Sequence, residues 1–380
     1  MNKPLLKALY IFIFSGLSWG TYAQQSLPPK IKRNSLYAGI DVGSKGVKLS
    51  IISMGKNAAS TGQFTAVKDS SVNTDFISFT PASFHETLGA LTGLYNAALT
   101  GYDIPAGRIF TVVSSGVKGQ AEKENKSDWI IKLSDSFRLA VNEPGRVVDV
   151  IDVTEEARLS HLGIVPEVRR YNTFLIDIGS GNTKGGYFKD GNTSNMKLFN
   201  LSWGTKTITN ATNKRIDGNE SIGNYEKQLA RVLAGDPETE IIYAVNESGA
   251  YNMNDNFAFS GGISWSVATL LYPEMADNAV VPFTYKELED FNERLTNLYN
   301  LMSPSILTRD IKDEELKQEA MTEISRVQKV FDQKALMAGT GLLLKIVRQF
   351  EGTLDKKKFF LVKNGQVGWI SAYVNQTLRK

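Results

Sequence analysis

The sequence contains no cysteine, and it has only two histidines, His85 and His161, in 380 residues. The lack of cysteine excludes disulfide bonds, thiolate zinc sites and a cysteine nucleophile. With so few histidines, a histidine-built metal site or a serine-histidine triad is also disfavoured. Chemistry in this chain therefore depends on carboxylates, lysines, hydroxyl groups and backbone amides.

The chain also lacks a strong excess of either charge. Its 43 Lys and Arg residues oppose 40 Asp and Glu residues, which leaves a formal net charge of +3. This excess is too small to argue for a nucleic-acid partner. The hydrophobic fraction of 42% is typical of globular proteins, and the length favours two to three domains.

Long apolar runs are absent except at the amino terminus. Two lysines in the first seven residues precede the apolar run 8–19, and a small-residue site ends in Ala23. This order predicts a secretory signal peptide over residues 1–23, because the run is short for a membrane span of about 20 residues. An uncleaved anchor is the alternative. We expect the mature chain to begin with a polar linker over residues 24–35, to contain no membrane span, and to be periplasmic or secreted.

One strand-and-turn motif occurs twice, as "YAGIDVGSKGVKLSI" at 37–51 and as "TFLIDIGSGNTKGGYF" at 173–188. In each copy an aspartate ends an apolar strand, a Gly-Ser turn follows, and a lysine lies seven residues after the aspartate. A glycine-rich turn lets backbone N–H groups approach a ligand that a side chain would block. Two such turns facing each other would bind a phosphate chain from both sides; the alternative is a purely structural turn.

The predicted elements follow the same order around both copies. The first half reads as strands over 36–41, 47–53, 62–69, 108–116 and 146–152, with helices over 84–98, 118–140 and from Thr154 as N-cap. The second half reads as strands over 173–179, 184–190, 195–203, 240–246 and 257–262, with helices over 219–234 and 263–272. Helices over 284–303 and 310–350 and a hairpin over 358–374 complete the chain. This pattern predicts a first domain over 36–165 and a second domain over 166–380, with a helical insertion at about 284–335.

The duplicated turns resemble those of the sugar-kinase, heat-shock chaperone and actin superfamily. More specifically, "VTEEARLSHLG" at 153–163 is similar to the Glu-Glu-Ala-Arg-Leu segment of the exopolyphosphatase and guanosine pentaphosphate phosphatase family. Four other segments have counterparts there in the same order: 175–183, 202–209, 259–270 and 335–347. The resemblance extends over about residues 36–375. It implies an α/β protein of two duplicated ribonuclease-H-like (actin-like ATPase) domains with a phosphate-binding cleft between them.

The resemblance also implies roles for individual residues. Glu156 would be the general base that activates water; the alternative is an exposed glutamate in the first turn of a helix, which the helix dipole favours. Asp177 would hold Mg²⁺, and Arg158 would be a structural ion-pair partner. The residues implied to bind phosphate are Asp41, Gly43, Ser44 and Lys45 in the first motif and Gly179, Ser180, Gly181, Asn182, Thr183 and Lys184 in the second.

The chain departs from the family pattern at three places. Lys184 stands where the family carries a glutamate, and Lys45 stands where an asparagine is usual. The Thr-x-x-Leu-Arg segment that supplies a phosphate-binding arginine is absent near residues 114–122. These changes remove one metal-facing carboxylate but keep the positive charge that an anion requires.

Together these features predict a secreted phosphoanhydride hydrolase that releases phosphate from polyphosphate or a nucleotide polyphosphate, with water as acceptor. One alternative is an apyrase-like nucleoside triphosphate hydrolase, a group that shares the turns but has Glu-Glu-Gly in its third motif. The other is a phosphate-chain binding protein that has lost turnover, which the departures favour. Export to a compartment poor in ATP disfavours a kinase or an actin-like filament. A homodimer is a further expectation from the resemblance.

Overall fold

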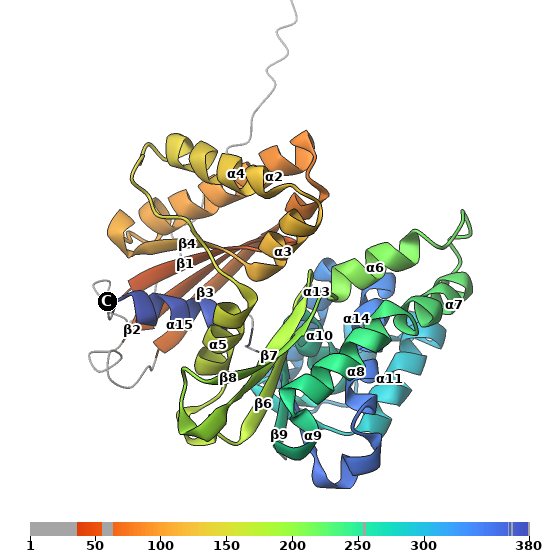
Figure 1. Ribbon diagram of the computed structural model, residues 1–380. Helices are drawn as coiled ribbons and strands as arrows, with labels where there is room; N and C mark the ends of the chain where they lie inside the picture. The colour runs from red at the N-terminus through yellow and green to blue at the C-terminus, as the bar shows by residue number, and fades with distance from the viewer. Residues whose placement is uncertain (1–35, 55–63, 254–255, 364, 366–367, 379–380) are drawn as a thin grey trace, which may run out of the picture.

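The computed structural model describes residues 36–54, 64–253, 256–363, 365 and 368–378 (Figure 1). The predicted signal peptide and linker, residues 1–35, lie outside these ranges. Within them, no helix combines the length and the apolar composition that a membrane crossing requires. The fold consists of two sheets, each covered by helices, and the two sheets belong to the two halves of the chain.

The first sheet has the strand order β3-β2-β1-β4-β5. Strands β1, β2 and β3 form an antiparallel meander, and β4 and β5 continue the sheet parallel to β1. Its strands are β1 (Leu36–Val42), β2 (Gly46–Met54), β3 (Phe64–Asn73), β4 (Ile109–Val113) and β5 (Asp149–Val150). The helices of this half are α2 (Pro81–Asn96), α3 (Ser115–Lys123), α4 (Ser127–Ala140) and α5 (Val153–Ile164).

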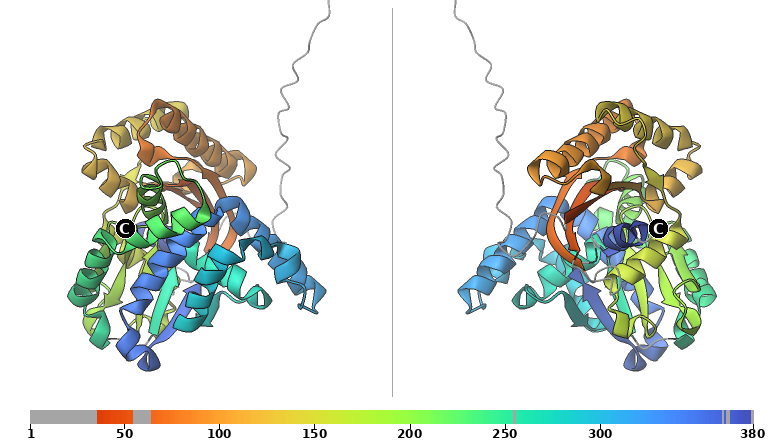
Figure 2. Two further views of the ribbon diagram at one scale, coloured as in Figure 1. Left: turned by 90° about the vertical axis from the view of Figure 1, so that its right-hand side faces the viewer. Right: turned by 90° about the vertical axis from the view of Figure 1, so that its left-hand side faces the viewer.

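The second sheet has the order β10-β11-β9-β6-β7-β8 and repeats the arrangement of the first. Its strands are β6 (Thr173–Ile178), β7 (Thr183–Phe188), β8 (Met196–Leu201), β9 (Asn256–Ser260), β10 (Val280–Phe283) and β11 (Lys358–Val362). Between β8 and β10 lie α6 (Thr205–Asn213), α7 (Ile222–Leu233), α8 (Asp236–Ser248), α9 (Ala250–Met253) and α10 (Gly262–Leu271). The region predicted as an insertion contains α11 (Tyr285–Asn297), α12 (Pro304–Leu307) and α13 (Glu314–Val330), and α14 (Gln333–Arg348) follows. In both side views the blue helix α13 extends away from the second half, to one side (Figure 2).

The register of the two sheets shows the same duplication. Asp41 on β1 lies opposite Lys48 on β2, and Asp177 on β6 lies opposite Lys184 on β7. In both sheets the central strand is parallel to the next strand on its other side, β4 or β9. The predicted fold class, two duplicated α/β domains, is therefore confirmed.

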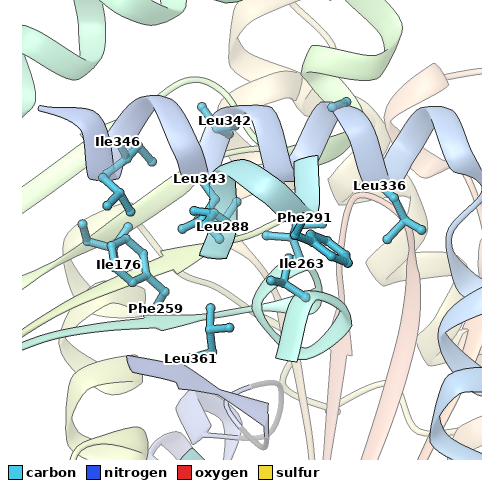
Figure 3. Packing of buried hydrophobic residues seen from close by; sticks show 14 of the residues in the cluster. Ile176, Phe259, Ile263, Leu288, Phe291, Leu336, Leu342, Leu343, Ile346 and Leu361 are labelled. Carbon is cyan, nitrogen blue, oxygen red and sulfur yellow. The ribbon is translucent and has the colours of Figure 1, made fainter. Parts of the chain in front are cut away.

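The larger hydrophobic core lies between the second sheet and its helices. Figure 3 shows α14 lying across this core, with Leu336, Leu343 and Ile346 directed toward Phe259 and Ile263. All five side chains are fully buried. Burial of this kind, worth about 1.5–3 kcal/mol for each large apolar side chain, holds the strand ends of the second sheet in place.

The chain returns to the first sheet at its carboxyl end. After β11, helix α15 (Gly368–Thr377) packs on α5 and β1, and Figure 1 shows it in dark blue beside the strands of the first sheet. A Cβ atom on Gly163 would lie 1.9 Å from the carbonyl oxygen of Gly368, so this close crossing of α5 and α15 requires glycine. The sequence-based boundaries assign this helix to the second domain, whereas it packs against the first sheet.

Two predicted strands are helices, and those predictions were wrong. Residues 240–246 lie within α8, where Ile241, Ala244 and Val245 are buried at helical spacing. The predicted hairpin over 358–374 is strand β11 followed by helix α15. Both errors have one cause: a short apolar run does not distinguish a strand from a buried helix segment.

Two local predictions also need correction. Asp152, not Thr154, is the N-cap of α5, and its side chain accepts a hydrogen bond from the N–H group of Glu155. The strand predicted over 146–152 is reduced to the two residues of β5. The other predicted strands and helices of both halves are present, with ends that shift by a few residues.

Candidate functional site

The two duplicated turns have the same geometry and face each other. In the first, the Gly43 N–H donates to the Gly46 carbonyl over 2.9 Å; in the second, the Gly179 N–H donates to the Asn182 carbonyl over 3.0 Å. Contact between the turns is so close that a Cβ atom on Gly181 would lie 2.4 Å from the Ser44 hydroxyl oxygen. The two turns therefore meet, as the sequence predicted.

A cavity of about 410 Å³ lies between the two halves of the chain. With one exception, every predicted site residue lines it: Asp41, Gly43, Ser44, Lys45, Glu156, Asp177, Gly179, Ser180, Gly181, Asn182 and Lys184. The exception is Thr183, which is fully buried and donates its hydroxyl hydrogen to the Trp203 carbonyl over 2.7 Å. Its hydroxyl group therefore contacts the protein rather than the cavity.

The backbone amides of the turns are only partly available to a ligand. The N–H groups of Gly43 and Gly179 close their own turns, so they cannot also donate fully to a phosphate. Within the described part of the chain, the N–H groups of Ser44, Ser180 and Gly181 have no acceptor in the protein. These three amides are among the donors that the turns offer to an anion.

Glu156 is 2% exposed, which rules out the alternative of an exposed glutamate in a helix turn. It lies in the first turns of α5, and its Oε2 accepts a hydrogen bond of 2.6 Å from the N–H group of Ser115. Because Ser115 begins α3, the carboxylate also lies at the positive end of that helix. Its Oε1 lies 2.9 Å from the Lys184 ammonium nitrogen.

Asp177 ends β6 and is also engaged on both oxygens. Its Oδ1 accepts a hydrogen bond of 2.8 Å from the Ser260 hydroxyl, and its Oδ2 lies 3.1 Å from the Lys184 nitrogen. Burial alone would lower the pKa of Lys184, but the negative charges of Glu156 and Asp177 outweigh it and raise that pKa above its usual range. Both contacts favour the charged form of Lys184.

Asp41 is the corresponding aspartate of the first sheet, and it has no such partner. Its Oδ1 is buried and makes no hydrogen bond within the described part of the chain. Burial, together with the nearby charge of Glu156, raises the pKa of Asp41 from 3.8 to about 7, against the opposing effect of Lys48. The Ser180 hydroxyl in the facing turn is likewise buried without a partner. Two unpaired polar atoms at one cavity are expected where a polar ligand binds.

Lys45 extends from the first turn to the second half of the chain. Its ammonium donates to the Val330 carbonyl, at the last residue of α13, over 2.6 Å, and it lies 4.1 Å from the centre of the Phe331 ring. Burial lowers the pKa of Lys45 to about 8, with Asp332 opposing the change. A phosphate in the cavity would compete with Val330 for this ammonium.

Three further cations line the cavity and were not among the predicted site residues. They are Lys48 on β2 and Arg326 and Lys329 on α13. The sequence could have identified Lys48, because it holds the position in the first motif that Lys184 holds in the second. Nothing in the local pattern of α13 distinguishes Arg326 and Lys329 from the other charged residues of that helix.

The contacts of Asp177 bear on the predicted magnesium site. Among the described residues, no group of three or more His, Cys, Asp or Glu side chains is placed to hold a metal ion. The two carboxylates nearest the predicted position, Glu156 and Asp177, both bind the Lys184 ammonium. The residues present therefore do not fit a divalent cation between these carboxylates.

Arg158 has the structural role that the sequence predicted. It binds Glu155 on the same helix over 2.8 Å and also donates to Gln376 on α15. These contacts join α5 to the carboxyl-terminal helix.

The two duplicated α/β halves and their facing turns define the two-domain actin-like fold, with a cavity between the halves. No protein-family model matches the sequence, and no curated protein is similar to it. Solved structures are similar over most of the chain. An Aquifex aeolicus Ppx/GppA family member is 17% identical, with a TM-score of 0.57, and the match covers 90% of this chain and 96% of that one.

Two further structures agree. An exopolyphosphatase-like protein is 13% identical with a TM-score of 0.61, and the match covers 90% of this chain and 98% of that chain. An exopolyphosphatase from Cytophaga hutchinsonii is 13% identical with a TM-score of 0.54, with 90% and 97% covered. The chain thus has the fold of the Ppx/GppA exopolyphosphatases, and the resemblance predicted from its motifs is confirmed at the level of the fold.

Proposed function

We propose that this protein is a phosphoanhydride hydrolase that releases phosphate from the end of polyphosphate or a nucleotide polyphosphate. The observation that carries the proposal is one cavity that both duplicated turns and Glu156 line. A terminal phosphoryl group between the turns would meet the amides of Ser44, Ser180 and Gly181 and the ammonium groups that line the same walls. Phosphoryl transfer depends mainly on such positioning and electrostatics.

In the proposed reaction Glu156 accepts a proton from water as the water oxygen attacks the terminal phosphorus. The bond between that phosphorus and the bridging oxygen breaks, and the remaining chain leaves with the bridging oxygen and its negative charge. Each oxygen of Glu156 already accepts one contact, from Ser115 or Lys184. A carboxylate has about four acceptor sites, so a water molecule can still bind.

A second candidate is a phosphate-chain binding protein without turnover. The observation that favours it is the same ion pair, because the Lys184 ammonium already occupies the oxygen that would take the proton, at a distance of 2.9 Å. The amides and lysines of the cavity would bind an anion in either case. Binding and hydrolysis are separated only by measuring turnover.

The decisive experiment is phosphate release by the purified chain, starting at Gln24, with long-chain polyphosphate and ATP tested side by side. Release from polyphosphate supports the proposal, and release from ATP alone supports the apyrase-like alternative. No release from either, together with binding of both, supports the binding protein. Each substrate is tested with magnesium and with a chelator.

Glu156→Gln tests the base directly. Glutamine can still accept the hydrogen bond from Ser115 but cannot take a proton, so turnover should fall by about 10²–10⁴-fold while substrate affinity holds. Glu155→Gln is the matched control: it is the neighbouring glutamate on α5, and Arg158 binds its carboxylate instead. Equal turnover in Glu156→Gln and Glu155→Gln would remove the general-base role.

Export and a homodimer also belong to this proposal. Export is supported by the order of basic, apolar and small residues over 1–23. The homodimer is supported only by the family resemblance, and light scattering of the purified chain tests it.

A further inference from the structure

The feature with the widest consequence is the position of the Lys184 ammonium. It lies between two carboxylates that come from different halves of the chain, 2.9 Å from Glu156 and 3.1 Å from Asp177. The side chain of Lys184 is 5% exposed, that of Glu156 is 3% exposed and that of Asp177 is 10% exposed. All three line the phosphate cavity.

Lys48, the corresponding lysine of the first sheet, does not lie between two carboxylates in this way. Lys48 lies opposite Asp41 in the same register in which Lys184 lies opposite Asp177. Lys48 is only half-buried and lines the open cavity, and Asp41 keeps an unpaired oxygen. Only the second lysine is enclosed by carboxylates from both halves.

These contacts place a positive charge where a divalent cation between the two carboxylates would have to lie. A divalent cation such as magnesium binds carboxylate oxygens that are deprotonated and free to approach it. Here the oxygens of Glu156 are bound by Ser115 and Lys184, and those of Asp177 by Ser260 and Lys184. A cation that entered would first have to displace a buried ammonium of the same sign.

A cation is nevertheless needed at this place. Asp41, Glu156 and Asp177 are close enough for their charges to influence one another, and an anionic phosphate chain would add to their repulsion. An ammonium group carries three N–H donors. Two of those of Lys184 are used by Glu156 and Asp177, which leaves the third for an oxygen in the cavity.

We propose that the Lys184 ammonium takes the place of a divalent cation, so that this cleft binds phosphate chains in their metal-free form. This inference rests on the proposed function for the identity of the ligand. The cations that line the walls, Lys45, Lys48, Arg326 and Lys329, supply the remaining positive charge. The ligand class is a free polyphosphate or nucleotide polyphosphate rather than its magnesium complex.

The test measures binding rather than activity, with inorganic tripolyphosphate and Mn²⁺ as probes. Calorimetry with the wild-type chain should show tripolyphosphate bound in EDTA at least as tightly as in excess magnesium. Titration with Mn²⁺ alone, followed by its paramagnetic resonance signal, should show no stoichiometric site. Tripolyphosphate binding at least about tenfold tighter in magnesium, or one tightly bound Mn²⁺ per chain, would overturn the inference. Neither measurement requires a variant to fold.

Lys184→Glu adds a directed change. It removes the ammonium and introduces a carboxylate, so binding in EDTA should weaken by about tenfold or more and should recover in magnesium. The matched control is Lys197→Glu, the same charge change at an exposed position on β8 of the same sheet. An equal loss in both variants would attribute the effect to net charge and overturn the specific role of Lys184.

Failure of this inference is distinguishable from failure of the proposed function. Phosphate release that requires magnesium, with magnesium-dependent binding, would contradict the role of Lys184 and leave the hydrolase intact. Metal-free binding without any phosphate release would support Lys184 and contradict the hydrolase.

Discussion

Asp41→Asn should make the protein more stable above pH 7, although it alters the proposed phosphate site. The reason is that Asp41 is buried with an unpaired oxygen, and its pKa rises from 3.8 to about 7 on folding. A group whose pKa is raised in the folded state contributes stability below its unfolded pKa, and that contribution is lost as the pH rises through the folded pKa. The ionised carboxyl therefore destabilises the wild-type protein at pH 8, and asparagine has no charge to bury.

The size of the effect follows from the two pKa values. They differ by about 3 pH units, and each unit corresponds to ~1.4 kcal/mol, so the full effect is about 4 kcal/mol. Roughly two of these units lie between pH 5 and pH 7. Between pH 5 and pH 8 the wild-type free energy of unfolding should therefore fall by about 2–3 kcal/mol more than that of Asp41→Asn.

Urea-induced unfolding at pH 5 and pH 8, followed by tryptophan fluorescence, measures this difference. Asp310→Asn serves as the control, because the side chain of Asp310 is 87% exposed and should leave the pH dependence unchanged. The same pH dependence in wild type and Asp41→Asn would show that the carboxyl is already ionised at pH 5 in the folded protein. The reasoning from burial would then be wrong.

Three other predictions concern the turns, a buried histidine and the amino terminus. Gly43→Ala should leave its turn intact, since the new Cβ meets nothing closer than 3.4 Å, whereas Gly179→Ala places a Cβ 2.9 Å from the Asn182 carbonyl. If both turns contact tripolyphosphate, both variants should bind it more weakly. Only Gly179→Ala should also have a lower melting temperature. Weaker binding in one variant alone would contradict the two-sided cleft. Burial lowers the pKa of His161 from 6.5 to about 4, so its contribution to stability is present above pH 6.5 and is lost as the pH falls through 4. Between pH 6.5 and pH 4 the wild-type free energy of unfolding should fall by about 3 kcal/mol more than that of His161→Gln. This pH dependence is opposite in sign to that of Asp41. The same acid unfolding in wild type and His161→Gln would refute the prediction. Mass spectrometry of the natively expressed protein should find Gln24 as the first residue. An intact amino terminus would contradict the export prediction.

Most of the site could be predicted because its residues are local to one repeated motif. The aspartate, the turn glycines and the lysine lie within a few residues of each other, and strand pairing then places each lysine opposite its aspartate. The contact of Lys184 with Glu156 joins β7 to α5, and nothing in either local pattern predicts it. The same holds for Ser115, whose N–H group meets Glu156 from another helix.

The fold was predictable where strands alternate clearly with turns, and it was mispredicted where burial decides the structure. Helix α8 buries Ile241 and Val245 but leaves Tyr243 67% exposed, a pattern that a short apolar stretch conceals. Helix α15 is helical because it packs on α5 and β1, far away in sequence. Contacts of this range depend on the assembled fold, so they cannot be inferred from a single segment.

Two passages of the chain connect the halves, and they lie side by side where α5 and α15 cross. One passage of the chain runs from α5 to β6, and the other runs from β11 to α15, with Gly163 and Gly368 in contact. A single connection would leave the halves freer to twist and to separate, whereas two adjacent connections restrain both movements. The contacts of Lys45 with Val330 and of Lys206 with Asp75 bridge the same halves. A phosphate that took the Lys45 ammonium from Val330 would therefore also remove one of these bridges.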